Sequence, residues 1–389
     1  MALRAAKRLS PMTKRSPAIC TLSPSQVAAF RLQRHHLTAR REPDLIRVSA
    51  EVCGIQAQLM PAAHLALWAR TRNLAPATIE AALWRDRTLV KTLCMRQTLH
   101  LLPATEHSLY MAAVRRSRVA AIVRIMARFE ITHRDTETLN RATLEMLEGG
   151  PLTLRDLAAR VRPRVSRRVR AWMDRVWNPM RLAIAAGLVC YGPDSGREVT
   201  LVRVDQWLPR LKSMAENPAK RLLLIKYLRA YGPATLRDFS HWSGIPVNEA
   251  RDTWDASADD LGQVRIEGRE AWALREDLKT LAHANLTSPV VRLLPAFDSF
   301  LLAHAEKDHL VAPRFYKRVY RAQGWVLPVL LLDGIVVGTW SRVRRGPTLA
   351  ITVRPFAKLS RRVREGIEQE AASLGRFLSA KPNVEISRP

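Results

Sequence analysis

Two glutamines stand two residues apart in an otherwise apolar segment and are the first candidates for chemistry in this sequence. Gln56 and Gln58 lie within residues 53–59, whose other members are Cys, Gly, Ile, Ala and Leu. In a helix their side chains would point about 200° apart, but Gly54 and Pro61 predict a break, where i and i+2 face one pocket. Two neutral amides there can hold one water molecule, because each offers an acceptor oxygen and donor hydrogens. The alternative is that both glutamines cap a helix end.

Common catalytic signatures do not accompany this pair. The sequence has no glycine-rich phosphate loop, no His-Glu-x-x-His motif, no Gly-x-Ser-x-Gly motif and no close pair of carboxylates in an apolar setting. Cysteines at positions 20, 53, 94 and 190 are scattered, without a Cys-x-x-Cys pair. We therefore expect no metal site, no cofactor and no disulfide framework, and a reducing cytosol as the location.

The charge of the chain indicates a polyanionic partner. Its 389 residues include 63 Lys+Arg and 35 Asp+Glu, a net charge of +28. Lysine and arginine that neutralise phosphates release counterions, so nucleic acid is the favoured partner, with anionic membranes and acidic proteins as alternatives. The longest apolar run, residues 326–332, is far shorter than the roughly 20 residues that span a bilayer. A soluble protein of two to four units is predicted.

An internal repeat organises the middle of the chain. Residues 150–156 and 232–238 share the order Gly-Pro-x-Thr-Leu-Arg-Asp, in which the threonine can cap a helix and the aspartate reaches back to the same amides. The first copy is followed by a predicted helix over residues 169–186 and strands over 188–191 and 199–204. The second is followed by a helix over 246–258 and strands over 263–266 and 270–274. Helix, helix and hairpin indicate a winged helix in each.

Residues 24–102 fit the same plan more loosely. Ser23 with Gln26 predicts the cap of a helix through residue 37, followed by helices over 44–54, 61–71 and 76–84 and strands over 88–93 and 97–102. Beyond residue 288, strands over 326–332, 335–341 and 348–353 and a helix over 360–377 are predicted. The fold class is mainly α with β hairpins (α+β). The units are a basic, disordered extension (1–21), three winged helices (22–135, 136–214, 215–286), a β-rich region (287–380) and a tail (381–389).

Four strings in order resemble one family. Residues 54–58 (GIQAQ) with 65–70 (LALWAR), residues 96–103 (RQTLHLLP), residues 293–298 (LLPAFD) and residues 333–340 (DGIVVGTW) resemble the AlkZ/YcaQ family of winged-helix DNA glycosylases. The order and spacing match from about residue 22 to residue 378. Each string alone is weak, whereas four in order form a specific signal.

The resemblance implies excision of bases alkylated at a ring nitrogen, with Gln56 and Gln58 as the catalytic pair. Gln-x-Gln is similar to the branch that unhooks interstrand crosslinks and bulky N7-purine adducts, whereas the other branch carries an aspartate at the position of Gln58. No lysine is singled out as a Schiff-base nucleophile, so a monofunctional glycosylase is expected. Its expected partner is double-stranded DNA with alkylated bases or crosslinks, bound by a monomer in a bacterial, nucleoid-associated cytoplasmic setting, with no membrane.

Arginines on two segments are candidates for DNA binding. Arg342, Arg344 and Arg345 stand on a predicted tight turn that can enter a groove, with a merely solvated turn as the alternative. A second group precedes the second helix of a winged unit and consists of Arg164, Arg167, Arg168 and Arg170.

One histidine and two tryptophans that follow the glutamine pair in the sequence are candidates for the core. His100 can contact the lesion or be a core histidine, and Trp68 and Trp84 are expected in the core. Tandem winged helices on so basic a chain also suit a DNA-binding regulator or architectural protein without chemistry, which is the alternative function.

Overall fold

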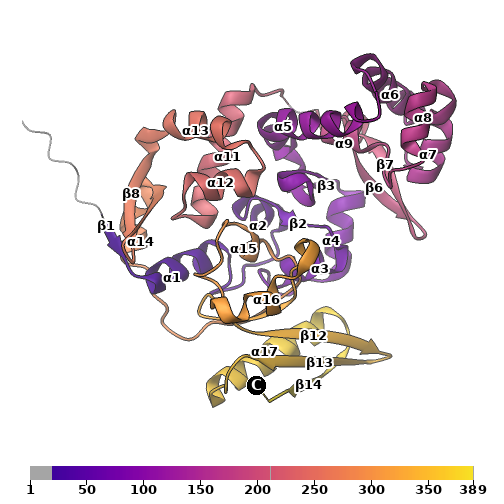
Figure 1. Cartoon of the computed structure of the whole chain (residues 1–389). Helices are drawn as coiled ribbons and strands as arrows, with labels where there is room; N and C mark the ends of the chain where they lie inside the picture. Colours follow the sequence, from indigo (N-terminus) through magenta and orange to yellow (C-terminus); the bar gives the residue numbers. More distant parts are fainter. Residues whose placement is uncertain (1–19, 211, 389) are drawn as a thin grey trace, which may run out of the picture.

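Helices surround three β-sheets in the computed structural model, which describes residues 20–210 and 212–388 (Figure 1). Helix accounts for 49% and strand for 22% of the structure, so the predicted α+β class is confirmed. The predicted extension, residues 1–21, lies outside the described residues except for its last two, which belong to strand β1 (Cys20–Leu22). Among the described helices, none has the length and apolar character needed to cross a membrane.

Short helices flank the two glutamines in the first region. Its elements are α1 (Pro24–Arg34), α2 (Leu45–Glu51), β2 (Ile55–Gln56), α3 (Met60–Trp68), α4 (Pro76–Glu80), a π-helical turn (Ala81–Arg85), β3 (Leu89–Leu93) and β4 (Leu99–Pro103). The predicted capping box of α1 is confirmed, because the Gln26 amide donates to Ser23 Oγ and the Ser23 amide donates to Gln26 Oε1. Helix α2 ends before residue 54, because Cys53 and Gly54 have φ of 56° and 91°, which a right-handed helix cannot accommodate.

The second region departs from prediction at one helix. It contains α5 (His107–Ala127), α6 (His133–Met146), β5 (Leu152–Thr153), α7 (Leu154–Val161), α8 (Arg167–Met173), α9 (Arg181–Ala185), β6 (Val189–Ser195) and β7 (Glu198–Arg203). The prediction of a single helix over 169–186 was wrong. Pro179 has no N–H and disfavours helical geometry before it, and Asn178 Oδ1 accepts from the Met180 amide at 2.9 Å, so the chain turns between α8 and α9.

The third region contains the second copy of the repeat. Around it lie α10 (Val204–Trp207), α11 (Glu216–Tyr231), α12 (Leu236–Ser243), α13 (Val247–Asp255), β8 (Leu261–Ile266), β9 (Arg269–Leu274) and α14 (Leu278–Ala282). Both repeat threonines cap helices as predicted, accepting from the amides of Asp156 at 3.1 Å and Asp238 at 3.2 Å. Asp238 also accepts from the amide of its own threonine, Thr235, at 2.9 Å. The order of elements is that of the predicted winged helices, and the division into three units stays a prediction.

The predicted hairpins do not remain separate. The hairpins β3–β4 and β6–β7 join through the pairing of Lys91 with Tyr191, giving one six-stranded sheet in the order β2-β4-β3-β6-β7-β5. Strand β1 adds in parallel to β8 of the β8–β9 hairpin. The first region is therefore bonded to both of the regions that follow it.

A five-stranded sheet forms the C-terminal region. Its elements are β10 (Val291–Leu294), α15 (Ser299–Leu302), α16 (Tyr316–Val319), β11 (Val329–Leu332), β12 (Ile335–Arg345), β13 (Thr348–Pro355), α17 (Arg361–Phe377) and β14 (Lys381–Ile386). The predicted helix over 360–377 is confirmed. The prediction of a tail over 381–389 was wrong, because β14 pairs in parallel with β13. In Figure 1 the β12–β13 hairpin and the group α6 to α8 project from the body at the right.

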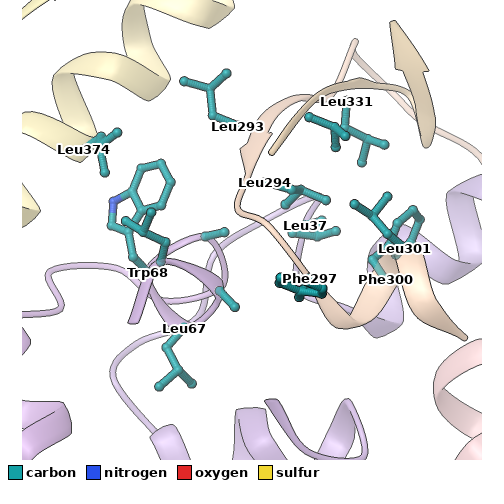
Figure 2. Packing of buried hydrophobic residues seen from close by; sticks show 14 of the residues in the cluster. Leu37, Leu67, Trp68, Leu293, Leu294, Phe297, Phe300, Leu301, Leu331 and Leu374 are labelled. Atoms are coloured by element: carbon teal, nitrogen blue, oxygen red, sulfur yellow. The ribbon is translucent and has the colours of Figure 1, made fainter. Parts of the chain in front are cut away.

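One apolar core joins the first region to the C-terminal sheet. Figure 2 shows Trp68 facing Leu293 and Leu374 across it, whereas Leu67 points away from both. Trp68 is 2% exposed, as predicted, whereas Trp84 is half-buried and donates to Glu80 Oε2 at 2.6 Å.

The strings that suggested the family bond to one another in this core. Arg70 forms a fully buried, two-pronged ion pair with Asp298 at 2.7 and 2.8 Å. The indole of Trp340 donates to the Leu294 carbonyl at 2.8 Å. Strand pairing also joins residues 54–58 to residues 96–103, so all four strings are structural partners, which explains why they occur together.

Candidate active site

Gln56 lies on a short strand at the edge of the six-stranded sheet. Strand β2 pairs antiparallel with β4, with Gln56 opposite His100, and the Ala57 amide continues the pairing to the Leu99 carbonyl at 2.7 Å. The extended backbone predicted here is confirmed. The alternative of a helix cap is not supported, because the N-cap of α3 is Leu59 and no side chain caps that helix.

The amide of Gln56 is held in one orientation. Its Oε1 accepts from Arg96 Nη2 at 2.8 Å and, more weakly, from Thr98 Oγ1 at 3.4 Å. A guanidinium only donates, so the atom that faces it must be the amide oxygen. Gln56 is 6% exposed, and the described residues provide no hydrogen-bond acceptor for its Nε2. The orientation leaves the two N–H donors of this amide available.

Gln58 differs from Gln56 in exposure but faces the same stretch of chain at the start of β4. It is exposed, and its Oε1 accepts from the Leu99 amide at 3.4 Å, a long hydrogen bond. Gln56 contacts Thr98 and Gln58 contacts Leu99, so the two amides lie along one short stretch of chain. The site therefore consists of one enclosed amide and one open to solvent.

The turn between β3 and β4 is built into the surrounding structure. Arg96 and Gln97 both have left-handed backbones, with φ of 51° and 57°. Arg96 Nη1 donates to the Trp242 carbonyl at the end of α12 at 2.8 Å, and Arg181 of α9 donates to the Gln97 carbonyl at 2.9 Å. The second and third regions thus hold the turn that carries the partner of Gln56.

Arg96 is the charged group nearest to this pair. Burial lowers its pKa to about 10, so it is protonated at neutral pH, and among the described residues it has no ion pair with a carboxylate. Sequence reasoning treated it only as part of a family string. The available signal was that Arg96 is the only charged residue between Leu93 and His100. Within residues 20–210 and 212–388, no group of three His, Cys, Asp or Glu side chains is placed to hold a metal ion.

His100 is buried beside the pair and is neutral. It is 2% exposed, and burial together with Arg96 lowers its pKa to about 3. Its Nδ1 lies 3.0 Å from the Thr98 carbonyl, which can only accept, so Nδ1 carries the proton and Nε2 is an acceptor. Directly opposite residues of antiparallel strands point to the same face, so His100 shares a face with Gln56. A contact of His100 with the lesion stays a prediction.

The three arginines predicted on a turn lie instead on the last part of β12, because the turn itself is formed by Gly346 and Pro347. Arg344 donates to the carbonyls of Leu378 and Ser379 at the end of α17, at 3.0 and 3.4 Å. The side chains of Arg342 and Arg345 form no hydrogen bond or ion pair with another described residue, although their backbones belong to the β12–β13 pairing. Arg345 is exposed, whereas Arg342 is half-buried and burial lowers its pKa.

The second arginine group is divided in the same way. Arg168 donates to the Glu130 carbonyl at 2.9 Å, and Arg164 lies 4.0 Å from the carboxylate of Glu145. Arg167 and Arg170 are exposed on one face of α8 and form no such contact with the described residues. These two are the members of the group that are free to meet an anion.

The chain is similar in sequence and in structure to known DNA glycosylases. The sequence profile of a family described as DNA glycosylase AlkZ-like matches residues 50–377, which include both glutamines, the β3–β4 turn and the β12–β13 hairpin. An interstrand DNA cross-link repair glycosylase of Streptomyces sahachiroi is 32% identical over 366 residues, 90% of this chain and 95% of that protein. The solved structure of Streptomyces sahachiroi DNA glycosylase AlkZ matches with a TM-score of 0.83 and 28% identity, covering 94% of this chain and 100% of that one.

Proposed function

The chain belongs to the AlkZ-like family of DNA glycosylases, and we propose that it hydrolyses the N-glycosidic bond of N7-alkylated purines in duplex DNA. Gln56 and Gln58 hold the attacking water in this proposal. The observation that carries it is the position of both amides along residues 98–99, where β4 begins, one enclosed and one open to solvent.

The chemistry suits so mild a pair. An N7-alkylated purine is cationic, so its glycosidic bond is already weak and the base departs neutral without a strong general acid. Glutamine does not act as an ordinary base near neutral pH, so its contribution is to position water against the developing positive charge on the sugar. Normal bases, which leave as anions, are expected to remain intact. The reaction is hydrolysis alone, without strand cleavage.

We extend the proposal to interstrand crosslinks and bulky adducts. The support is the relative of Streptomyces sahachiroi, whose name gives it a role in cross-link repair. Arg342, Arg344 and Arg345 on the β12–β13 hairpin are the proposed groove contacts. The arginines at and before the start of α8 meet phosphates in the same proposal, Arg167 and Arg170 with free side chains and Arg164 and Arg168 after giving up their present contacts.

Base release from a defined duplex tests the proposal. A duplex with one N7-methylguanine is incubated with the protein, and alkaline cleavage then reveals abasic sites. We expect release from this duplex, none from an unmodified one, and strong loss in Gln56→Ala and Gln58→Ala. Gln33→Ala is the matched control, because Gln33 is exposed on α1 and its side chain hydrogen-bonds, among the described residues, only to the Asn285 carbonyl. Absence of release by the unaltered protein under single-turnover conditions would favour a DNA-binding regulator instead.

A further inference from the structure

We infer that Arg96 is a positioning residue that makes Gln56 a hydrogen-bond donor to the attacking water, while Gln58 serves as the acceptor. The inference rests on the proposed function and assigns different roles to two residues of the same type. The difference in roles follows from the Gln56 amide, whose oxygen already accepts a hydrogen bond from Arg96.

The first step is the orientation of the Gln56 amide. A free glutamine amide exchanges oxygen and nitrogen by rotation about its last side-chain bond, and either atom can then face the substrate. Arg96 Nη2 at 2.8 Å from Oε1 removes this freedom, because reversal would bring the amide N–H groups against a guanidinium that has no acceptor. The enclosed amide therefore offers donors to anything placed beside it.

The second step is the rigidity of Arg96 itself. Its other terminal nitrogen, Nη1, donates to the Trp242 carbonyl at 2.8 Å, so the guanidinium spans from α12 to β2. Gly244, with φ of 76°, lies so near that an added Cβ would be 3.2 Å from the Arg96 amide nitrogen. A guanidinium fixed at two points by the protein preorganises the amide before substrate binds.

The third step concerns Gln58. The only hydrogen bond of its side chain to the described residues is the long one from the Leu99 amide to Oε1, and an amide oxygen has a second lone pair. A water that accepts from Gln56 Nε2 and donates to Gln58 Oε1 keeps one lone pair free for the sugar. The second lone pair is the one needed to attack C1′.

The reaction then balances without a base in the protein. The C1′–N9 bond breaks with both electrons passing to N9, which neutralises the cationic purine. The water oxygen bonds to C1′, and the proton it loses passes to solvent on the side of the exposed Gln58. Neither glutamine changes its protonation state.

Substitution by glutamate separates the two roles, because glutamate keeps the acceptor but lacks N–H groups. Single-turnover release of N7-methylguanine should fall in Gln56→Glu about as far as in Gln56→Ala, roughly a hundredfold. Gln58→Glu should stay within about tenfold of the unaltered protein. Retained activity in Gln56→Glu together with loss in Gln58→Glu would overturn the assignment of roles.

Variants of Arg96 test positioning directly. Arg96→Ala should release base at least tenfold more slowly with DNA affinity within threefold, and guanidinium ion should restore part of the rate when compared with sodium chloride of equal ionic strength. The double variant Arg96→Ala/Gln56→Ala should show no such restoration. Arg31→Ala is the control for structural damage, because Arg31 is also buried and donates to carbonyls of the third region, those of Tyr231 and Pro233, without touching either glutamine.

The rates of these variants test the role of Arg96 separately from the proposed glycosylase function. An unchanged rate in Arg96→Ala, with strong loss in the two glutamine-to-alanine variants, would overturn the role of Arg96 and leave the proposed active site standing. An unchanged rate in both of those glutamine variants would overturn the active site and the inference together.

Discussion

Two hairpins of this protein carry arginine near their turns and use it in opposite ways. All five residues of β3 are buried, and Arg96 after it donates to Gln56 and to the Trp242 carbonyl. The end of β12 projects from the body (Figure 1), and the exposed side chain of Arg345 there bonds to no other described residue. An arginine whose N–H groups bond to protein atoms orients neighbouring side chains. An arginine whose N–H groups are free can bind DNA phosphates.

The largest expected effect is at the buried hairpin. Gln56→Ala and Gln58→Ala should each lower single-turnover base release by roughly ten- to a thousandfold, with DNA affinity within about threefold, because positioning one water is commonly worth about 2 to 4 kcal/mol. The double variant should lose less than the product of the two singles, since both act on one water. Gln58→Asp should keep some activity on small cationic lesions. Independent, multiplying losses would argue against a shared water.

Salt should affect the exposed side of the comparison instead. With a net charge of +28, duplex binding should weaken by a log–log slope of about −0.9 per phosphate contact. For four contacts, affinity should fall on the order of a hundredfold between 50 and 200 mM salt, with little dependence on sequence. Titration of a labelled duplex by fluorescence anisotropy measures this slope. A nearly flat response would count heavily against DNA held through free arginines.

Gly244→Ala should weaken the support of the buried turn. The new Cβ would lie 3.2 Å from the Arg96 amide nitrogen, in a left-handed backbone where alanine is strained by about 1 to 2 kcal/mol. Base release should fall by about tenfold, read in the single-turnover assay alongside a thermal melt. Gly268→Ala is the matched control, because Gly268 has φ of 81° but no atom within 4 Å of its added Cβ. Equal loss of rate in both variants would attribute the effect to backbone strain alone.

Removing the β12 arginines should have a smaller and substrate-dependent effect. The combination of Arg342→Ala, Arg344→Ala and Arg345→Ala should slow excision of bulky adducts or crosslinks several-fold more than excision of a methyl lesion. Arg344→Ala alone should also lower the free energy of unfolding by about 1 kcal/mol, because it leaves the α17 carbonyls without a donor. Arg345→Ala should not. Equal loss on both substrates would reduce the hairpin to a general phosphate contact.

We expect the rate of base release to be independent of pH near neutrality. His100 has a pKa of about 3 and is neutral, so base release should show no inflection near pH 6.5 between pH 5.5 and 9. Stability should respond, because the unfolded chain binds the His100 proton near pH 6.5 while the folded chain does not. That contribution is present above pH 6.5 and is lost as pH falls, by on the order of 2 kcal/mol at pH 5. Urea unfolding of the unaltered protein and of His100→Gln at several pH values measures this contribution, which the variant should lack.

Local signals explain what was predicted correctly. The capping pairs Ser23 with Gln26 and Thr235 with Asp238 lie within four residues, and strand alternation between turns is equally local. The exception over residues 169–186 is also local, because Pro179 interrupts the helix that the surrounding residues favour. The residues after 380 contain no strong strand signal of their own, and β14 exists because β13 offers it an edge.

For the active site, the sequence by itself determined the pair of amides and the break that extends them, because Gly54 and Pro61 act on their own neighbours. Only the tertiary structure decided what the amides can do. Arg96 is 40 residues from Gln56 and 146 from Trp242, and neither distance leaves a periodic trace in the sequence. The hydrogen bonds of the guanidinium depend on where its partners lie in space and not on their separation in the sequence. The orientation of the Gln56 amide is therefore fixed only when α12, β2 and the β3–β4 turn have packed together.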